Sequence, residues 1–218
     1  MSAEVRRRIA DPTNKQSLGS RMRARRWERL YEHFPDLADM RVLDLGGTVD
    51  HWRGLPVRPS HLTIVNVHGQ SCDDPAVEVL VDDACAIEEV VADRQFDLVY
   101  TNSVIEHVGG HARRIRFAEN VRSLAPRHWV QTPYRYFPIE PHWLFPGFQF
   151  LPVSQRVWIT ERWPLGFNQQ KGEEALAEVL NTELIDRTEM RYLFPDSELF
   201  FERVAGVPKS MISVATGS

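Results

Sequence analysis

The sequence has no apolar run that approaches the roughly 18 residues required by a membrane-spanning helix. Its first residues, MSAEVRRRIADPTN, also lack the apolar core of a secretory signal peptide. No internal repeat and no low-complexity segment interrupts the chain. We therefore expect a cytoplasmic protein that is not inserted in a membrane.

Cysteine and positive charge are scarce as well. Cys72 and Cys85 are the only cysteines, and their spacing is not that of a metal site, so we expect reduced thiols, although one disulfide stays open. Lys and Arg number 26 against 30 acidic residues, which gives a formal net charge of −4. A surface that binds nucleic acid usually needs a basic excess, so we expect no nucleic-acid partner.

Arginines nevertheless crowd the N-terminal region. A solvated helix face explains them better than a basic arm for an anionic partner. Apolar residues between 18 and 34 recur at helical spacing, and Pro35 ends the pattern. Residues 1–39 are therefore expected to form a helical segment over the domain. The arginines concerned are Arg6, Arg7, Arg8, Arg21, Arg23, Arg25 and Arg26.

The rest of the chain alternates strands with helices, which predicts right-handed crossovers and a mainly parallel sheet. A short link joins the last two strands, so they should pair antiparallel. The fold class is α/β and Rossmann-like, with a seven-stranded sheet that ends in an antiparallel hairpin. Strands are expected at 41–45, 62–67, 77–81, 96–102, 128–131, 198–204 and 209–215, and helices at 84–94, 111–125, 173–180 and around 188–194. One domain, 1–218, would contain a ligand-binding core (40–132), an insertion (133–168) and a C-terminal helix and strand pair (169–218).

The insertion at residues 133–168, called here the lid segment, is rich in aromatic residues and holds six of the fourteen prolines. That many prolines should exclude a helix of ordinary length. A long irregular segment inside a compact domain predicts a lid or binding loop. A hydrophobic plug over one end of the sheet and a homodimer surface are the alternatives.

The stretch RVLDLGGTVDHWRG at 41–54 carries the clearest functional signal. A buried strand ends in Asp44 and breaks into Gly46-Gly47, where missing Cβ atoms let backbone N–H groups approach a ligand. It lacks the G-x-G-x-x-G of dinucleotide sites, and an acid there disfavours phosphate. The pattern suits a ligand with cationic groups or hydroxyls, such as S-adenosylmethionine. An ordinary tight turn is the alternative.

Polar residues follow the other strands too, and the carboxyl ends of parallel strands share one edge, where open α/β sheets bind ligands. Asn66 lies about 20 residues after Asp44, the separation at which a polar residue reaches a ribose hydroxyl, and an aspartate there should serve at least as well. Asp82, Asp83 and Ala84 suit an adenine amino group and ring, with helix capping as the alternative. After Asp44, the residues that follow the ends of the expected strands are Gly46, Gly47, Asn66, His68, Asp82, Asp83, Ala84, Asn102, Ser103, Glu106, His107, Thr132 and Tyr134.

Two Glu/His pairs are candidates for proton transfer. His107 follows Glu106, and His142 follows Glu140 within the lid segment. A histidine with an ordinary pKa near 6.5 can accept a hydroxyl proton. Glu106, Glu140 and His142 together are also a candidate site for a divalent metal such as Mg²⁺. A structural Glu cap and a buried histidine are the alternative for each pair.

The motifs VLDLGG (42–47), VDDACA (81–86) and FDLVYTNSVIEHVG (96–109) resemble, in order and spacing, those of class I S-adenosylmethionine-dependent methyltransferases. Thr48 and Asp50 stand where that family has further glycines, and Asn66 stands where it has an acid. The stretch TPYRYFPIEPHWLFP (132–146) also resembles a subgroup of small bacterial methyltransferases. Within that subgroup the whole chain is more weakly similar to the actinobacterial 1-O-methyltransferases of methylmannose polysaccharides.

The resemblance implies that Asp44, Gly46 and Gly47 face the methionine end of the donor. Asn66 would face the ribose, Asp83 and Ala84 the adenine, and Asn102 and Ser103 the floor of the donor site. The acceptor would be a small molecule or an oligosaccharide, with magnesium as a further cofactor. Residues expected to contact it are Tyr134, Arg135, Tyr136, Glu140, Trp143, Gln149 and Trp158.

The leading hypothesis is thus an O-methyltransferase in which His142 or His107, with Glu106 beside it, handles the hydroxyl proton. An N-methyltransferase of a small molecule and a non-catalytic donor-binding scaffold are the alternatives. A nicotinamide oxidoreductase is disfavoured by the missing glycine motif.

Overall fold

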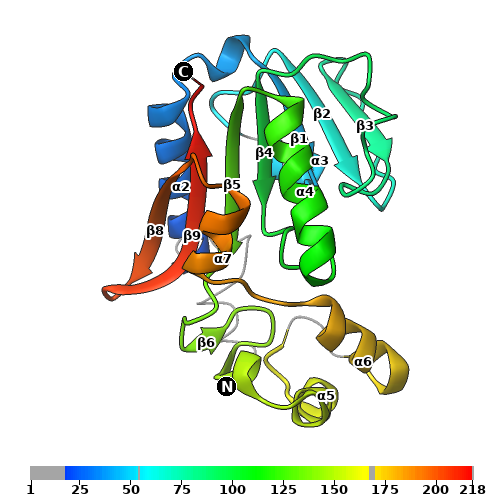
Figure 1. Cartoon of the computed structure of the whole chain (residues 1–218), viewed down its shortest axis with the longest axis vertical. Coiled ribbons are helices and arrows are strands. Elements are labelled where there is room, and N and C mark those ends of the chain that lie inside the picture. The colour runs from blue at the N-terminus through cyan, green and yellow to red at the C-terminus, as the bar shows by residue number, and fades with distance from the viewer. Residues whose placement is uncertain (1–17, 54, 167–169, 218) are drawn as a thin grey trace.

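The computed structural model describes residues 18–53, 55–166 and 170–217. Its main sheet has seven strands in the order β3-β2-β1-β4-β5-β9-β8 (Figure 1). The five N-terminal strands run parallel, and β9 pairs antiparallel with both β5 and β8. The strands are β1 (Arg41–Leu45), β2 (His61–Asn66), β3 (Val77–Val81), β4 (Leu98–Asn102), β5 (Arg127–Pro133), β8 (Glu198–Val204) and β9 (Val207–Ala215). The predicted fold class is confirmed.

Helices cover both faces of the sheet, which is why its strands read as continuous apolar runs. On one face α4 (Gly110–Leu124) and α7 (Arg187–Leu193) pack through Phe117, Val121 and Leu193. On the other, α2 (Leu18–His33), η1 (Leu37–Asp39) and the short α3 (Val49–Trp52) contribute Leu30 and Trp52. The α3 turn was not expected from the sequence.

The expected helix at 84–94 is wrong. The segment between β3 and β4 is a series of turns, with backbone bonds from Ala86 to Asp83, Val90 to Ile87 and Arg94 to Val91. These bonds span three residues, and the single four-residue bond, from Val91 to Ile87, does not extend into a continuous α-helical ladder. Buried Ile87 and Val91 produce the helix-like spacing, while β-branched side chains lower helix propensity.

The lid segment is more regular than its prolines suggested. It contains β6 (Ile139–Glu140), β7 (Phe145–Pro146), η2 (Phe148–Phe150) and α5 (Val153–Arg162). Pro152 immediately precedes α5, where no helical N–H is lost, so a ten-residue helix forms despite the expectation. With α6 (Gly172–Asn181), these elements lie beyond the carboxyl ends of the parallel strands (Figure 1). Trp143, Phe148, Ile159 and Val179 form their own core.

Of the N-terminal arginines, some lie within the described residues and others do not. Arg26 pairs with Glu202 of β8 at 2.5 Å and so ties α2 to the sheet, whereas Arg6, Arg7 and Arg8 lie outside the described residues. Cys72 and Cys85 are free thiols. Among the helices of the described ranges, none combines the length and apolar character required to cross a bilayer.

Candidate functional site

The turn after β1 is built so that only glycine fits. Gly46 has φ +80°, and a Cβ there would lie 2.5 Å from the side chain of Val104. A Cβ on Gly47 would lie 1.8 Å from Oδ2 of Asp44. The two glycines therefore let the loop close over the buried Asp44 carboxyl on one side and against Val104 on the other.

Two side-chain amides brace this loop from outside. Asn66 Nδ2 donates to the carbonyl oxygens of Gly46 (3.1 Å) and Gly47 (2.9 Å), and its Oδ1 accepts from the His68 N–H. Gln70 Nε2 also donates to Gly47, at 3.0 Å, while its Oε1 accepts from the Val49 N–H. Asn66 is thus a positioning residue for the glycine turn.

A pocket of about 240 Å³, called here the strand-end pocket, opens beside this loop. Among the residues expected to hold a donor, Asp44, Gly47 and Asn102 do not line it. Asn102 Oδ1 instead accepts from Arg26 at 2.6 Å. The lining residues are Gly46, Val65, Asn66, Val67, Asp82, Asp83, Ala84, Ser103, Val104, His107, Val108 and Arg113.

Asp44 acts from beneath the pocket. Its carboxyl is fully buried and Oδ2 accepts from Trp52 Nε1 at 2.7 Å. Burial raises the pKa of Asp44 to about 7, although the Trp52 hydrogen bond opposes the shift. Asp44 therefore supports the glycine loop and does not line the pocket.

The acids after β3 are already engaged. Asp83 accepts from Arg113 Nη2 at 2.5 Å and from the Cys85 N–H at 2.9 Å. Burial opposes the charged carboxylate, but the contacts with Arg113 and Cys85 together outweigh it, and the pKa of Asp83 is lowered. Asp82 Oδ1 accepts from the Asp83 N–H. The pocket therefore has an ionised acid on its wall at neutral pH.

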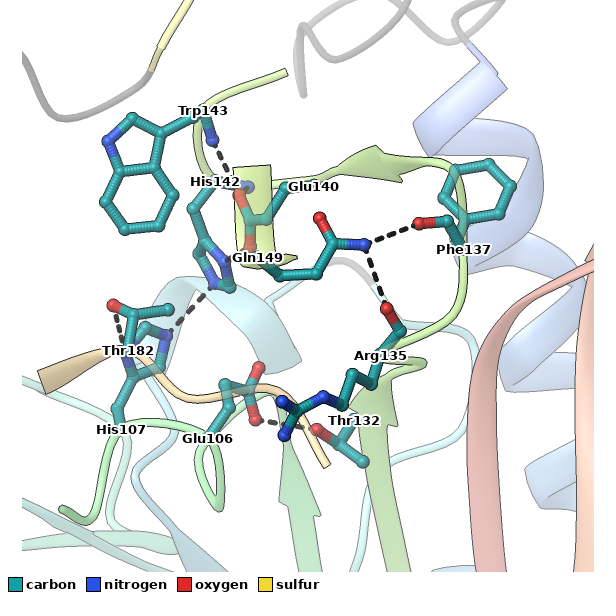
Figure 2. Close-up of polar contacts among 10 residues, drawn as sticks. All are labelled: Glu106, His107, Thr132, Arg135, Phe137, Glu140, His142, Trp143, Gln149 and Thr182. Carbon is teal, nitrogen blue, oxygen red and sulfur yellow. Dashed lines mark hydrogen bonds and ion pairs between the residues drawn. The ribbon is translucent and has the colours of Figure 1, made fainter. Parts of the chain in front are cut away.

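The two candidate histidines meet, as Figure 2 shows. His142 Nδ1 lies 2.6 Å from Glu140 Oε1, and its Nε2 lies 3.1 Å from His107 Nε2. His107 Nδ1 is 3.4 Å from the Thr182 hydroxyl. Glu140 Oε2 also accepts from the backbone N–H groups of His142 and Trp143. Because a carboxylate only accepts, Nδ1 of His142 carries a hydrogen and Nε2 is the exchangeable position.

The surroundings of the two imidazole rings shift their pKa values in opposite directions. Desolvation opposes a charged His142, but its bond to Glu140 and the surrounding carboxylates raise its pKa above the ordinary value. Packing around its ring and the charge of His142 lower the pKa of His107 to about 4. Of the two rings, His142 is therefore the stronger base, and a proton bound between the two Nε2 atoms resides on His142 while His107 accepts a hydrogen bond from it. Burial raises the pKa of nearby Glu106 to about 7, against the influence of His142, and Thr132 donates to its Oε2.

The residues that could hold a metal differ from those expected, because His107 takes the place of Glu140. Single ligand atoms of Glu106, His107 and His142 lie within 4.8 Å of one another, whereas Glu140 is occupied by its three donors. Two imidazoles and one carboxylate suit a transition metal, while Mg²⁺ prefers oxygen ligands. This set of metal ligands therefore does not fit the magnesium expected from the sequence.

A second pocket of about 260 Å³, the lid pocket, is formed between the lid segment and residues 179–184. Of the expected acceptor residues, Arg135, Glu140, Trp143 and Gln149 line it, and Tyr134 and Tyr136 do not. Its lining is completed by Phe148, Arg156, Val179, Leu180, Thr182, Glu183 and Leu184. His107 lines the strand-end pocket, and its contacts lead through His142 and Thr182 to the lid pocket. The histidine pair thus stands at the boundary between the two pockets.

The aromatic residues of the lid segment mostly pack on each other. Trp143 is 2% exposed and stacks on Phe148 at 4.1 Å. Tyr136 is exposed and stacks on Phe150, and Trp158 is exposed under the Arg162 guanidinium.

Several site residues escaped the sequence reasoning. Gln70, Arg113 and Arg156 belong to no recognised pattern, and Thr182 follows α6, far along the chain. Only the spacing of Gln70, four residues after Asn66, offered a signal, since a polar residue just past a strand end can reach the same edge.

Neither a protein-family model nor a curated protein sequence matches the chain. Solved structures do match its fold. The N-terminal domain of EvdMO1 with SAH bound is 15% identical over 90% of this chain and 81% of that one, with a TM-score of 0.51. The same domain in the presence of SAH and D-fucose is 16% identical over 99% and 97%, with a TM-score of 0.52.

Two further neighbours carry different names. The N-methyltransferase NodS from Bradyrhizobium japonicum is 9% identical over 93% of this chain and 97% of that chain, with a TM-score of 0.53. A putative Zn-dependent alcohol dehydrogenase from Rhodobacter sphaeroides is 14% identical over 88% and 96%, with a TM-score of 0.52. At these identities the likeness establishes a fold that methyltransferase structures share, and the function must be argued from the site.

Proposed function

We propose that this protein is an S-adenosylmethionine-dependent methyltransferase that acts on a hydroxyl group. The observation that carries the proposal is the Glu140–His142–His107 chain at the boundary of two pockets. A transferase needs a donor site and an acceptor site that meet at the reacting atoms. A carboxylate-oriented imidazole at that meeting point is the arrangement of a general base.

The strand-end pocket is proposed as the donor site. It lies at the carboxyl ends of β1, β2, β3 and β4, next to the glycine turn, as ligand sites of open α/β sheets do. Asn66 would reach the ribose, Asp83 and Ala84 the adenine, and Ser103 the floor. The likeness to a domain with SAH bound supports this choice of donor over a nicotinamide.

The donor would supply a methyl group on a sulfonium, which leaves as a neutral thioether. The protein holds the acceptor oxygen in line with that carbon, roughly 3 Å away. Neutral His142 accepts the hydroxyl proton at Nε2, while Glu140 keeps Nδ1 protonated and the ring oriented. The acceptor hydroxyl then takes the place of His107 as the partner of Nε2. His107, with its lowered pKa, does not compete for the proton.

A sugar or another small hydroxyl compound is the proposed acceptor, with the 1-OH of a methylmannoside as the specific candidate from the motif resemblance. Polar side chains in the lid pocket support it, and so does the neighbour crystallised in the presence of D-fucose. Magnesium is not part of the proposal, because two of the three candidate ligands are imidazoles and Mg²⁺ prefers oxygen. An amine acceptor is the second candidate, since it needs a base less.

Calorimetry with S-adenosylmethionine and with NAD⁺ tests the donor. Transfer of a labelled methyl group to a panel of sugars, phenols and amines then tests the reaction. His142→Ala should bind the donor as the wild type does and lose transfer. Saturable binding of NAD⁺, with none of S-adenosylmethionine, would overturn the proposal.

A further inference from the structure

The lid pocket contains two arginines that have no carboxylate bonded to them. Arg135 and Arg156 both line it. Within residues 18–53, 55–166 and 170–217, no side-chain hydrogen bond or ion pair involves either guanidinium, and Arg156 Nε is buried without a partner. Figure 2 draws Arg135 with only its backbone carbonyl engaged, by Gln149. Both arginines are half-buried, and the Nε of Arg156 is cut off from water, so two guanidiniums without a protein partner in one pocket need an explanation.

The acids on the same wall are committed elsewhere. Glu140 accepts from His142 and from two backbone N–H groups. Glu183 pairs with Arg114 of α4 at 2.8 Å, and Arg114 is itself shared with Glu189. The two guanidiniums of the pocket are therefore left without a carboxylate bonded to them, although Glu140 and Glu183 line the same pocket.

The two arginines act on each other. Burial lowers the pKa of the Arg156 guanidinium, and the positive charge of Arg135 adds to this, while the charges of Glu183 and Glu140 oppose it without cancelling it. Arg135 stands just after β5 and Arg156 on α5, so separate elements bring the two side chains to one cavity. An anion between them would relieve both the repulsion and the desolvation.

We propose that the lid pocket binds an anionic group of the methyl acceptor, a phosphate or a carboxylate, and that Arg135 and Arg156 hold it. The inference rests on the proposed function, because it names the class of compound that the transferase methylates. Planar guanidiniums bind the paired oxygens of either group in a bidentate manner. The acceptor would lie with its charged end in the pocket and a hydroxyl toward His142, which is bonded to the pocket residue Glu140.

The remaining polar atoms of the pocket fit such a compound. Gln149 donates both amide hydrogens to the carbonyl oxygens of Arg135 and Phe137, and its buried Oε1 has no partner among the described residues. Trp143 Nε1 is also buried and unpartnered there. One acceptor and one donor beside two cations suit a hydroxylated anion better than an apolar ring.

Calorimetric titration with inorganic phosphate, and separately with acetate, at an ionic strength held constant with NaCl, tests the pocket. We expect saturable binding of at least one anion, and the stronger of the two identifies the group. Arg135→Met and Arg156→Met should each weaken it about tenfold or more, since a hydrogen bond to a charged group is worth about 1.5–3 kcal/mol. Arg156→Lys keeps the charge and should retain part of the affinity.

Arg162→Met is the matched control, because Arg162 lies on the same helix, is paired with Glu161 and does not line the pocket. It should bind phosphate and acetate like the wild type. Binding that is non-saturable for both anions, or that survives both methionine variants, would overturn the anion site. Donor binding is measured separately. If S-adenosylmethionine fails to bind while phosphate binding depends on both arginines, the proposed function fails and the anion site stands.

Discussion

The Nε2 atoms of His107 and His142 lie 3.1 Å apart, with the His107 ring on the strand-end pocket and the His142 ring bonded to Glu140 of the lid pocket. Their environments push the two pKa values in opposite directions. His142 is therefore the stronger base of the pair, and a proton shared between the two Nε2 atoms belongs to it. Pairs of titratable groups whose environments separate their pKa values are the usual basis for assigning acid and base roles.

The pH dependence of methyl transfer should identify the base. His142 must be neutral to accept a proton, and its pKa is raised above 6.5, so the rate should rise with pH through a midpoint above 6.5. The sequence alone predicted a midpoint near 6.5. If His107 were the base, the midpoint would lie near 4. A rate profile between pH 4 and 9 with saturating donor distinguishes them, and a flat profile above pH 5 would exclude His142.

Glu140→Gln should shift that midpoint downward. The substitution removes the carboxylate charge that favours the protonated ring, while a glutamine carbonyl can still accept from Nδ1. His142→Ala should cost about 10²–10⁴ in rate, the usual worth of a general base. Both variants should bind the donor normally by calorimetry, because neither residue lines the strand-end pocket. Unchanged rates and midpoints in both would place the base elsewhere.

Sequence periodicity predicted the sheet because its signal is local. Each parallel strand is a short apolar run, and polar residues mark its end. The turns at 84–94 were misread because buried Ile87 and Val91 have helical spacing without a continuous ladder of helical hydrogen bonds. The α5 helix was missed because prolines were counted without regard to position, and Pro152 sits where a helix tolerates it.

The site was predictable only in part for the same reason. Gly46, Asn66, Asp83 and His107 follow strands, and the shared edge brings them together. Arg156 and Thr182 reach the site from segments whose placement depends on the packing of the lid segment. No spacing along the chain encodes that packing. The sequence likewise could not show that Asp44 supports the loop from below.

Asn66→Asp should weaken donor binding, the reverse of the expectation from sequence. The Asn66 amide donates to two carbonyl oxygens of the glycine turn, and a carboxylate would repel both. Asn66→Ala should lose about 1 kcal/mol per hydrogen bond, and the aspartate more. Calorimetry with S-adenosylmethionine measures the affinity, and amide hydrogen exchange reports the loosening of the turn. Donor binding by Asn66→Asp equal to the wild type would contradict the bracing role.

Gly46→Ala and Gly110→Ala form a matched pair that separates backbone strain from steric contact. Both glycines have positive φ, +80° and +65°, so each alanine should cost roughly 1–2 kcal/mol in the free energy of unfolding. A Cβ at Gly110 meets nothing within 4 Å, whereas one at Gly46 lies 2.5 Å from Val104. Gly46→Ala should therefore lower the free energy of unfolding more than Gly110→Ala does in urea titrations. It alone should also abolish binding of S-adenosylmethionine, because Gly46 and Val104 both line the strand-end pocket. Equal losses of stability, with donor binding intact in both variants, would show that the turn adjusts freely and does not form the donor site.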